Sequence, residues 1–156
     1  MSSSAKNTKV AAQIAVDYAK HLTAAAKGGS LDAFKSLFAD SCFVVLQDGE
    51  GQEVEFTLGE GDDCNMTWDQ FTEAAFKDLE AQKYDYTTSN CLGVLGQRMI
   101  LETGRMNTDA ELYMMASMLV EFREDGKIVG IESFNSVDID TALDAVAKTN
   151  VVMDDL

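Results

Sequence analysis

The stretch that decides the fold runs from residue 97 to residue 135 and reads QRMILETGRMNTDAELYMMASMLVEFREDGKIVGIESFN. It contains three runs with the length and composition of β-strands, and a fourth run precedes it. These runs are Tyr84–Leu95, Gln97–Met106, Leu112–Arg123 and Lys127–Asn135. The links between them are short and rich in turn residues: Gly96, Asn107-Thr108-Asp109 and Glu124-Asp125-Gly126. Because links of this length join neighbouring antiparallel strands, the pattern predicts a four-stranded meander.

One of these strands does not alternate between apolar and polar residues. Leu112–Val120 is apolar at almost every position, which is typical of a strand that is covered on both faces. In a small domain with helices on one side only, a second subunit is the natural cover for the other face. We therefore predict a homodimer that is built back to back on this sheet.

The chain before residue 84 predicts helices and one hairpin. From Val10 to Ala26, apolar residues recur every four positions as in an amphipathic helix, and Gly28-Gly29 ends it. Ser30 can cap a short second helix that turns Leu31, Phe34, Leu37 and Phe38 inward. Cys42–Leu46 and Val54–Leu58, joined by an Asp48-Gly49 turn, predict a short antiparallel hairpin.

Two more helices complete the expected order. Thr67 and Gln70 have the spacing of a capping box at the start of a third helix. Its buried stripe would be Trp68, Phe71, Ala75 and Leu79, and a last helix is expected over Asp140–Lys148. We expect one α+β domain over residues 9–150, with a flexible N-terminus over 1–8 and an acidic tail over 151–156.

The composition excludes several classes of partner. The chain has 156 residues, a net charge of -15 and no proline. A surface this acidic repels phosphate backbones and anionic lipid, so we expect neither nucleic acid nor membrane as a partner. Solubility in a salty or crowded compartment, or affinity for a cation or a basic partner, would both account for the charge.

The cysteines and the first residues of the sequence both indicate the cytoplasm. Cys42, Cys64 and Cys91 form no CxxC pair, which fits a reducing environment. The first residues contain no apolar segment of the kind found in signal peptides. We therefore expect a cytoplasmic protein.

The order of these elements resembles the nuclear transport factor 2-like (NTF2-like) superfamily, in its SnoaL-like branch. The resemblance lies in the first helix, the Gly-Gly end, Leu31-Asp32-Ala33-Phe34, and Phe38-Ala39-Asp40 before a strand. It continues in Phe122–Ile128 and in the helix that follows Asp138. It implies a cone in which a strongly curved antiparallel sheet wraps the long first helix and leaves a pocket at the open end. The superfamily includes isomerases, dehydratases, polyketide cyclases and epoxide hydrolases, and also non-catalytic interaction domains, so the fold alone does not assign a function.

The catalytic residues of the known branches are mostly missing at the matching positions. By resemblance to ketosteroid isomerases, the base falls on Leu46, the tyrosine on Leu22 and the acid on Met118, all apolar here. A slipped register would bring Asp48 or Tyr18 into this set. A dehydratase would need His21, which is better explained as a solvated helical histidine. An epoxide hydrolase would need an Asp-Arg-Asp relay through Arg98, and solvated surface positions explain Arg98, Arg105 and Arg123 better.

The cone also implies which residues line the pocket. On the strands these are Met99, Leu101, Thr103, Met114, Ala116, Met118, Val120, Ile131, Ser133 and Asn135, and Tyr18, Leu22, Phe38, Val45 and Trp68 close the volume. Such a cavity would suit a small apolar molecule that is held by one or two hydrogen bonds. The alternative is a filled core, because methionine adapts to irregular gaps without a ligand.

The carboxylates concentrate in one segment. Seven of them lie between Asp48 and Asp63, without Lys or Arg, but the position expected for the last ligand of an EF-hand is Gly59. We expect a solvated face here rather than a metal site.

Two functions remain open. The first is a pocket for a small apolar molecule, with isomerase, cyclase or lyase chemistry that needs no cofactor and uses Tyr18, Asp48 or Asn135. The second is a non-catalytic dimeric interaction or adaptor domain that meets a basic partner.

Overall fold

The computed structural model describes residues 3–47, 52–73, 86–107 and 112–134, and for residues 26, 47, 86, 105–107, 112–115 and 134 it describes the backbone only. In these ranges it contains helices α1 (Ser3–Ala26) and α2 (Asp32–Lys35), and a short helical segment over 68–73. Six strands make up one sheet: β1 (Phe38–Gln47), β2 (Glu53–Gly59), β3 (Tyr86–Leu95), β4 (Arg98–Asn107), β5 (Leu112–Phe122) and β6 (Ile128–Phe134). The expected α+β class is confirmed.

Helix α1 ends where the sequence predicted but begins earlier. The amide of Gly29 donates to the carbonyl of Ala24 and the amide of Gly28 to that of Ala25. Gly28 has a φ of 87°, so the two bonds form a Schellman cap. At the other end the helix begins at Ser3, whereas hydrophobic periodicity predicted Val10. The first helical turns are mostly exposed and polar, so they carry no periodic apolar signal.

The sheet is mixed, which corrects the expectation of an all-antiparallel sheet. Its strand order is β2-β1-β6-β5-β4-β3, and the predicted hairpin and meander are both present. However, β1 pairs with β6 in parallel, with Val44 opposite Ile131. The pairing begins at the corner after α2, where the amide of Ile128 donates to the carbonyl of Leu37. Strands so far apart in sequence leave no local signal for their pairing or direction.

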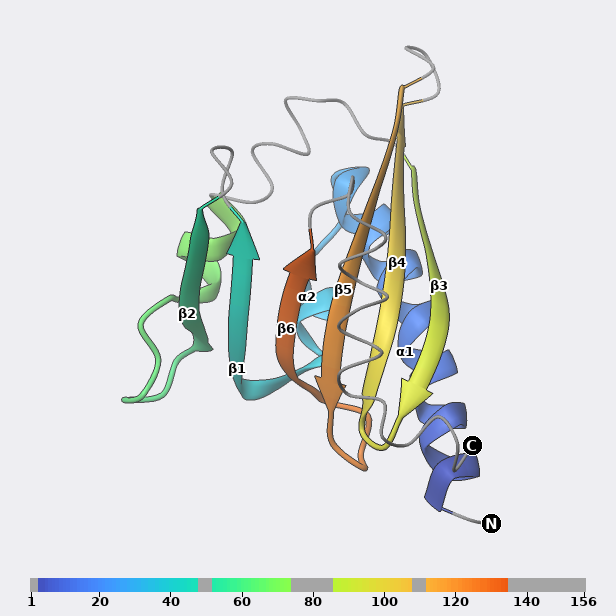
Figure 1. The fold of residues 1–156 in the computed structure, drawn as a ribbon. Helices are drawn as coiled ribbons and strands as arrows, with labels where there is room; N and C mark the ends of the chain where they lie inside the picture. The colour runs from blue at the N-terminus through green and yellow to red at the C-terminus, as the bar shows by residue number, and fades with distance from the viewer. Residues whose placement is uncertain (1–2, 48–51, 74–85, 108–111, 135–156) are drawn as a thin grey trace.

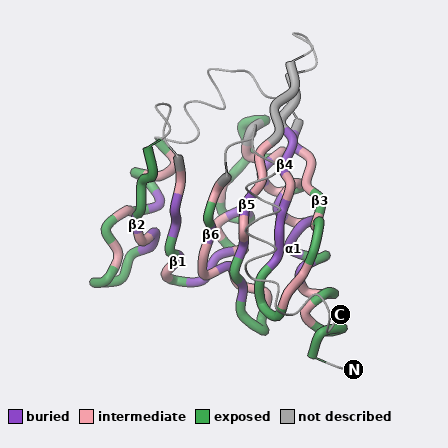
Figure 2. Tube along the Cα trace, viewed as in Figure 1, coloured by how far each residue is buried: buried purple, intermediate pink, exposed green. Residues whose placement is uncertain are grey.

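Register shifts bend the sheet in three places: between Phe38 and Phe43, between Cys91 and Gly93, and between Glu121 and Phe122. Irregularities of this kind increase local twist and curvature. Figure 1 shows α1 on one side of the curved sheet, alongside β3 and β4. Figure 2 shows mostly buried residues along β4 and more exposed residues along β2 and β3. Among the described residues, α1 forms a helical layer over one face of the sheet, which we call the inner face.

The third helix starts with the predicted capping box. The amide of Gln70 donates to Oγ1 of Thr67 over 3.2 Å, and the amide of Thr67 donates to Oε1 of Gln70 over 3.0 Å. Trp68 is buried and Phe71 is half-buried, as predicted. Ala75, Leu79, the turns at Asp48-Gly49 and 107–109, and the helix expected over Asp140–Lys148 fall wholly or partly outside the described residues.

A hydroxyl clamp attaches α1 to β3, which is an edge strand of the sheet. Oγ1 of Thr87 donates to the carbonyl of Ala19 over 3.0 Å, and Oγ of Ser89 donates to the carbonyl of Ala15. Two residues of a strand span about 6.6 Å and four residues of a helix about 6 Å, so the two hydroxyls match carbonyls one turn apart. Thr23 adds Oγ1, which accepts from the amide of Thr87 over 3.1 Å. The clamp therefore fixes the register between α1 and the sheet.

Candidate functional site

The inner face of the sheet is apolar, and the strand register shows which residues share it. Across β4 and β5, Met99 lies opposite Val120 and Leu101 opposite Met118. These four side chains are at most 8% exposed. Each pair of cross-strand neighbours points to the same face, so they lie together beneath α1. The parity that the sequence predicted for these two strands agrees with this arrangement.

A row of aromatic rings closes the inner face on the helical side. The ring of Phe34 lies 5.2 Å from those of Tyr18 and Phe38, and the ring of Trp68 lies 5.0 Å from that of Phe38. Phe71 follows at 5.8 Å from Trp68. All four contacts are edge-to-face, which is a favourable arrangement for aromatic rings. The row joins α1, α2, β1 and the segment 68–73 into one apolar wall.

Most of the residues expected to line a pocket belong to a single buried cluster. It contains the expected residues Tyr18, Leu22, Phe38, Trp68, Met99, Leu101, Met118, Val120 and Ile131. The cluster also contains Val44, Phe56 and Leu58, which the sequence did not assign to the wall. The alternation in β2 was the available signal for Phe56 and Leu58, and the parallel pairing of β1 with β6 brings Val44 to this face.

Val45 is the misplaced residue of the predicted wall. Its cross-strand partners are Glu55 and Glu132, which are both exposed, whereas Val44 lies opposite the buried Ile131. Val45 therefore points to the outer face and Val44 to the inner one. The sequence Phe43-Val44-Val45 is apolar throughout, so its pattern alone could not fix this parity.

Three expected site residues are not described in full. Asp48 and Asn135 lie outside the described residues, and for Met114 only the backbone is described, opposite Arg105. Their roles stay predictions.

The inner face changes character toward one end of the sheet. Thr103 pairs with Ala116, one step along the strands from Leu101 and Met118, and Ser133 pairs with Met118. Thr103 is buried, but Ala116 and Ser133 are half-buried although they share the inner face. Large, fully covered side chains thus give way to small ones that solvent reaches. Oη of Tyr18 lies within this neighbourhood, 4.0 Å from Sδ of Met118.

The positions that match known catalytic residues do not assemble an ionisable set. Leu22 and Met118 are buried in the apolar cluster, and Leu46 packs against it. Arg98 lies 3.9 Å from Glu121 in an ion pair whose side chains are about half exposed. Arg98 and Glu121 also line a groove on the outer face of the sheet, so Arg98 cannot serve a relay in the interior.

His21 lies at the rim of a different hollow. This hollow has a volume of about 370 Å³ and lies between α1 and the turn that joins β5 to β6. Asp17 and Glu124 also line it. His21 is half-buried, and it lines this hollow rather than the buried aromatic row.

The acidic segment is mostly exposed where it is described. Glu53, Glu55, Glu60, Asp62 and Asp63 all face solvent. In the part of the chain that the structure describes, no group of three or more His, Cys, Asp or Glu side chains could hold a metal ion.

The buried cysteine is chemically quiet. Burial raises the pKa of the Cys42 thiol to about 12, and burial also raises the pKa of the Cys91 thiol. A thiol reacts as its thiolate, so Cys42 acts as a small apolar residue beside Leu58, its partner in β2.

None of the described helices is long and apolar enough to cross a membrane.

The comparisons with known proteins concern the fold. No protein-family model matches the chain, and no curated protein matches it. Among solved structures, a de novo designed protein with a curved β-sheet matches with a TM-score of 0.46 and 18% identity, over 92% of this chain and 96% of that one. An NTF2-like protein of unknown function from Exiguobacterium sp. 255-15 matches with a TM-score of 0.45 and 22% identity, over 77% and 95%. An NTF2-like protein from Burkholderia thailandensis matches with a TM-score of 0.43 and 14% identity, over 85% and 96%. These are likenesses at low identity, so the NTF2-like superfamily and its SnoaL-like branch stay predictions from the element order.

Proposed function

We propose that the chain binds a small, largely apolar molecule at the end of the inner face where Thr103, Ala116 and Ser133 lie. The observation that carries the proposal is the change from large buried side chains to small half-buried ones on the same face. Small side chains on adjacent strands leave space that a ligand can fill, and partial exposure gives it a way in.

The polar groups near this space are few and neutral. They are the hydroxyls of Tyr18, Thr103 and Ser133. Oγ1 of Thr103 donates to the carbonyl of Ala116 over 3.4 Å, and a hydroxyl that donates can still accept a hydrogen bond from a ligand. Chemistry at such a site would be proton transfer to and from the substrate, as in an isomerase, cyclase or lyase of the SnoaL-like kind, and it needs no cofactor. The carboxylate of Asp48 would supply a stronger base than these hydroxyls, and the amide of Asn135 would donate or accept a hydrogen bond.

The test is ligand-induced stabilisation of a matched pair of variants. A library of small apolar compounds is screened by thermal unfolding with the wild type, Ala116→Leu and Ser117→Leu. A ligand at about 100 times its Kd stabilises the native state by about 2.7 kcal/mol. Ala116→Leu fills the inner space and should abolish the shift, whereas Ser117→Leu adds the same bulk on the opposite face and should preserve it. If no compound stabilises the wild type saturably, the inner face is a filled core and the proposal is wrong.

A second candidate function, a dimeric interaction domain, is favoured by the outer face. A shallow groove of about 220 Å³ lies there, and Phe43, Val45, Leu119 and Val129 contribute apolar side chains to it. Phe43 is 50% exposed. Exposed apolar surface around a groove is typical of a protein interface, and a second copy of the chain, packed back to back, would cover it.

Sedimentation tests the proposed dimer. Phe43→Lys places a charge in the proposed interface and should yield a monomer, whereas Val16→Lys, at another exposed apolar residue on α1, should leave the mass unchanged. A wild-type monomer at high concentration would rule out this dimer. The variants do not alter the inner face, so ligand binding is scored independently.

A further inference from the structure

A second hollow lies at the corner where α2 meets β1 and the turn between β5 and β6. Its volume is about 380 Å³, which is in the range of small-ligand sites. The buried residues Phe38 and Ala39 contribute an apolar part of its lining. This hollow is formed by other residues than the Thr103–Ala116–Ser133 region and is independent of the function proposed there.

Three cationic side chains line this hollow, in a chain whose net charge is -15. They are Lys35 of α2, Arg123 at the end of β5, and Lys127 before β6. Lys35 is far from Arg123 and Lys127 in the sequence, and the parallel pairing of β1 with β6 brings the three residues together. Arg123 is exposed beside a turn, as the sequence predicted, but the sequence did not predict the hollow.

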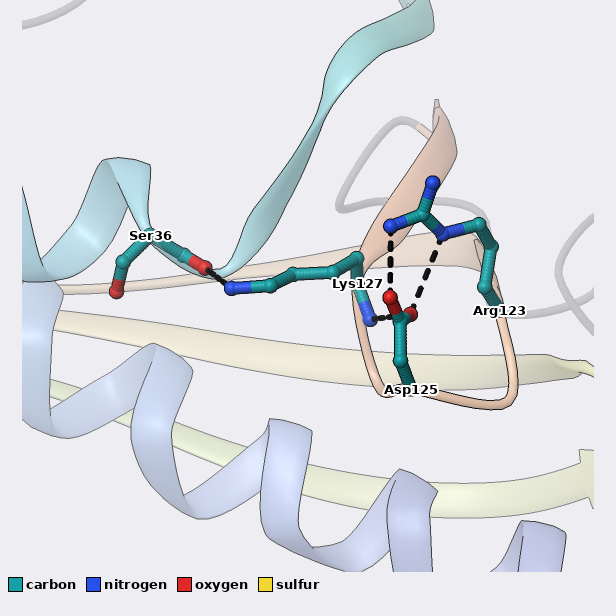
Figure 3. A network of polar contacts seen from close by, with 4 residues as sticks. All are labelled: Ser36, Arg123, Asp125 and Lys127. Carbon is teal, nitrogen blue, oxygen red and sulfur yellow. Dashed lines mark hydrogen bonds and ion pairs between the residues drawn. The ribbon is translucent and has the colours of Figure 1, made fainter.

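Contacts with the protein hold two of these cations in place (Figure 3). Nε and Nη2 of Arg123 donate to the two carboxylate oxygens of Asp125 over 3.2 and 2.7 Å. Nζ of Lys127 donates to the carbonyl of Ser36. Each of these groups keeps further N–H donors, so the contacts orient the cations without using all of their hydrogen-bonding capacity.

The third cation, Lys35, lies close to a tryptophan whose fluorescence can report on binding. Nζ of Lys35 lies 5.8 Å from the centre of the Trp68 ring, within the range of a cation–π contact. Trp68 is the chain's single tryptophan. A ligand that engages Lys35 should therefore change tryptophan fluorescence.

Two carboxylates line the same hollow without neutralising the lysines. Asp32 and Asp40 are both exposed, and neither forms an ion pair within 4.0 Å with Lys35 or Lys127 in the described structure. A simple anion would meet repulsion from these carboxylates, and a simple cation would meet repulsion from the three basic groups. A molecule that carries both charges would satisfy both sides.

We propose that this hollow binds a small zwitterion with a carboxylate at one end and a protonated amine at the other. The carboxylate would accept hydrogen bonds from Lys35 and Lys127, and from the donors of Arg123 that Asp125 leaves unused. The ammonium would lie toward Asp32 and Asp40. The short alkyl chain between the charges would contact Phe38 and Ala39.

The experiment is a titration with ω-amino acids of increasing length, from glycine to 6-aminohexanoate, followed by Trp68 fluorescence and checked by calorimetry. Butyrate and butylamine serve as ligands with one charge only. We expect saturable binding that is strongest for one chain length and at least about fivefold weaker for either single-charge ligand. Equal binding of butyrate would show a plain anion site, and equal binding of butylamine a plain cation site. Either result, or no binding at any length, overturns the proposal.

Charge-neutral variants then test both ends of the site. Lys35→Gln and Asp40→Asn should each weaken binding of the best ω-amino acid by about fivefold or more, as measured by calorimetry because Lys35→Gln also alters the reporter. Lys27→Gln removes the same charge at an exposed position after α1 and should leave the affinity unchanged. Equal effects of Lys35→Gln and Lys27→Gln would mean that only net charge matters, and would also overturn the proposal.

Discussion

Replacing Thr87 by valine tests whether the hydroxyl clamp fixes α1 on the sheet. Thr87 is 4% exposed, and its Oγ1 lies 3.0 Å from the carbonyl of Ala19 and 2.6 Å from Oγ1 of Thr23. Valine has nearly the same shape as threonine, so the substitution removes these hydrogen bonds without opening a large cavity. The effect on the free energy of unfolding should therefore report the hydrogen bonds.

The magnitude follows from what the substitution leaves behind. Ala19 keeps its place within the helix, and Thr23 still accepts from the amide of Thr87, so no group loses every partner. A typical net contribution of about 0.5–1.5 kcal/mol for each of the two hydrogen bonds then gives a destabilisation of about 1–3 kcal/mol. In a domain of this size that lowers the melting temperature by about 2–12 °C.

Chemical and thermal denaturation of three variants measure the effect. Thr87→Ser keeps the hydroxyl and should recover most of the lost stability. Thr88→Val changes the neighbouring residue, which points to the opposite face of β3, and should change the free energy of unfolding by less than about 0.5 kcal/mol. If Thr87→Val and Thr88→Val unfold at the same midpoint, the clamp does not stabilise the fold and the reasoning fails.

Three further predictions concern single sites. Gly59 has a φ of 149°, and a Cβ at this position would clash with the carbonyl oxygen of Asp40. Gly59→Ala should therefore lower the free energy of unfolding by about 2 kcal/mol or more, as measured by chemical denaturation. Gly93→Ala should lower it by less than about 1 kcal/mol, because no atom lies within 4 Å of a Cβ there. Cys42 should resist alkylation at pH 8.5 while half-buried Cys64 reacts, as peptide mass spectrometry would detect; rapid labelling of folded Cys42 would contradict its burial and its pKa of about 12. Hydrogen bonds from Arg123 and from the amide of Lys127 lower the pKa of Asp125 below 3.8, so the native state gains stability from this carboxylate above pH 3.8 and loses it as the pH falls through the lowered pKa. Asp125→Asn should flatten this acidic limb of the unfolding profile, and an unchanged limb would exclude Asp125 as its source.

Local chemistry predicted the elements and several of their ends. Thr67 and Gln70 form their capping box because the partners are three residues apart, and Gly28 ends α1 because glycine adopts a positive φ at little cost. Gly96 and Gly126 turn the meander for the same reason. The resemblance to the cone fold also predicted which residues of β4 and β5 face inward, since a strand's side chains alternate with a period of two once one of them is placed.

The candidate sites could be predicted only in part. Most of the expected wall, including Tyr18, Trp68 and Met118, does lie together on the inner face. Val45 was assigned to the wrong face of the sheet because it lies in a run of three apolar residues, and such a run does not indicate which of its side chains point inward. The hollow lined by Lys35, Arg123 and Lys127 could not be predicted from local sequence, because Lys35 and Lys127 are far apart in the chain and each is an ordinary surface lysine.

The sequence alone therefore determined the end of α1, the start of the helix at Thr67, the hairpin, the meander and the apolar character of the inner face, which all depend on residues within a few positions of each other. Tertiary structure decided that β1 joins β6 in parallel, that hydroxyls of β3 attach to carbonyls of α1, and that five charged side chains surround one hollow. These features are pairings between distant segments. These pairings use backbone groups and charged side chains, which are present throughout any protein. The sequence therefore does not indicate which of them come into contact, and only the folded structure shows it.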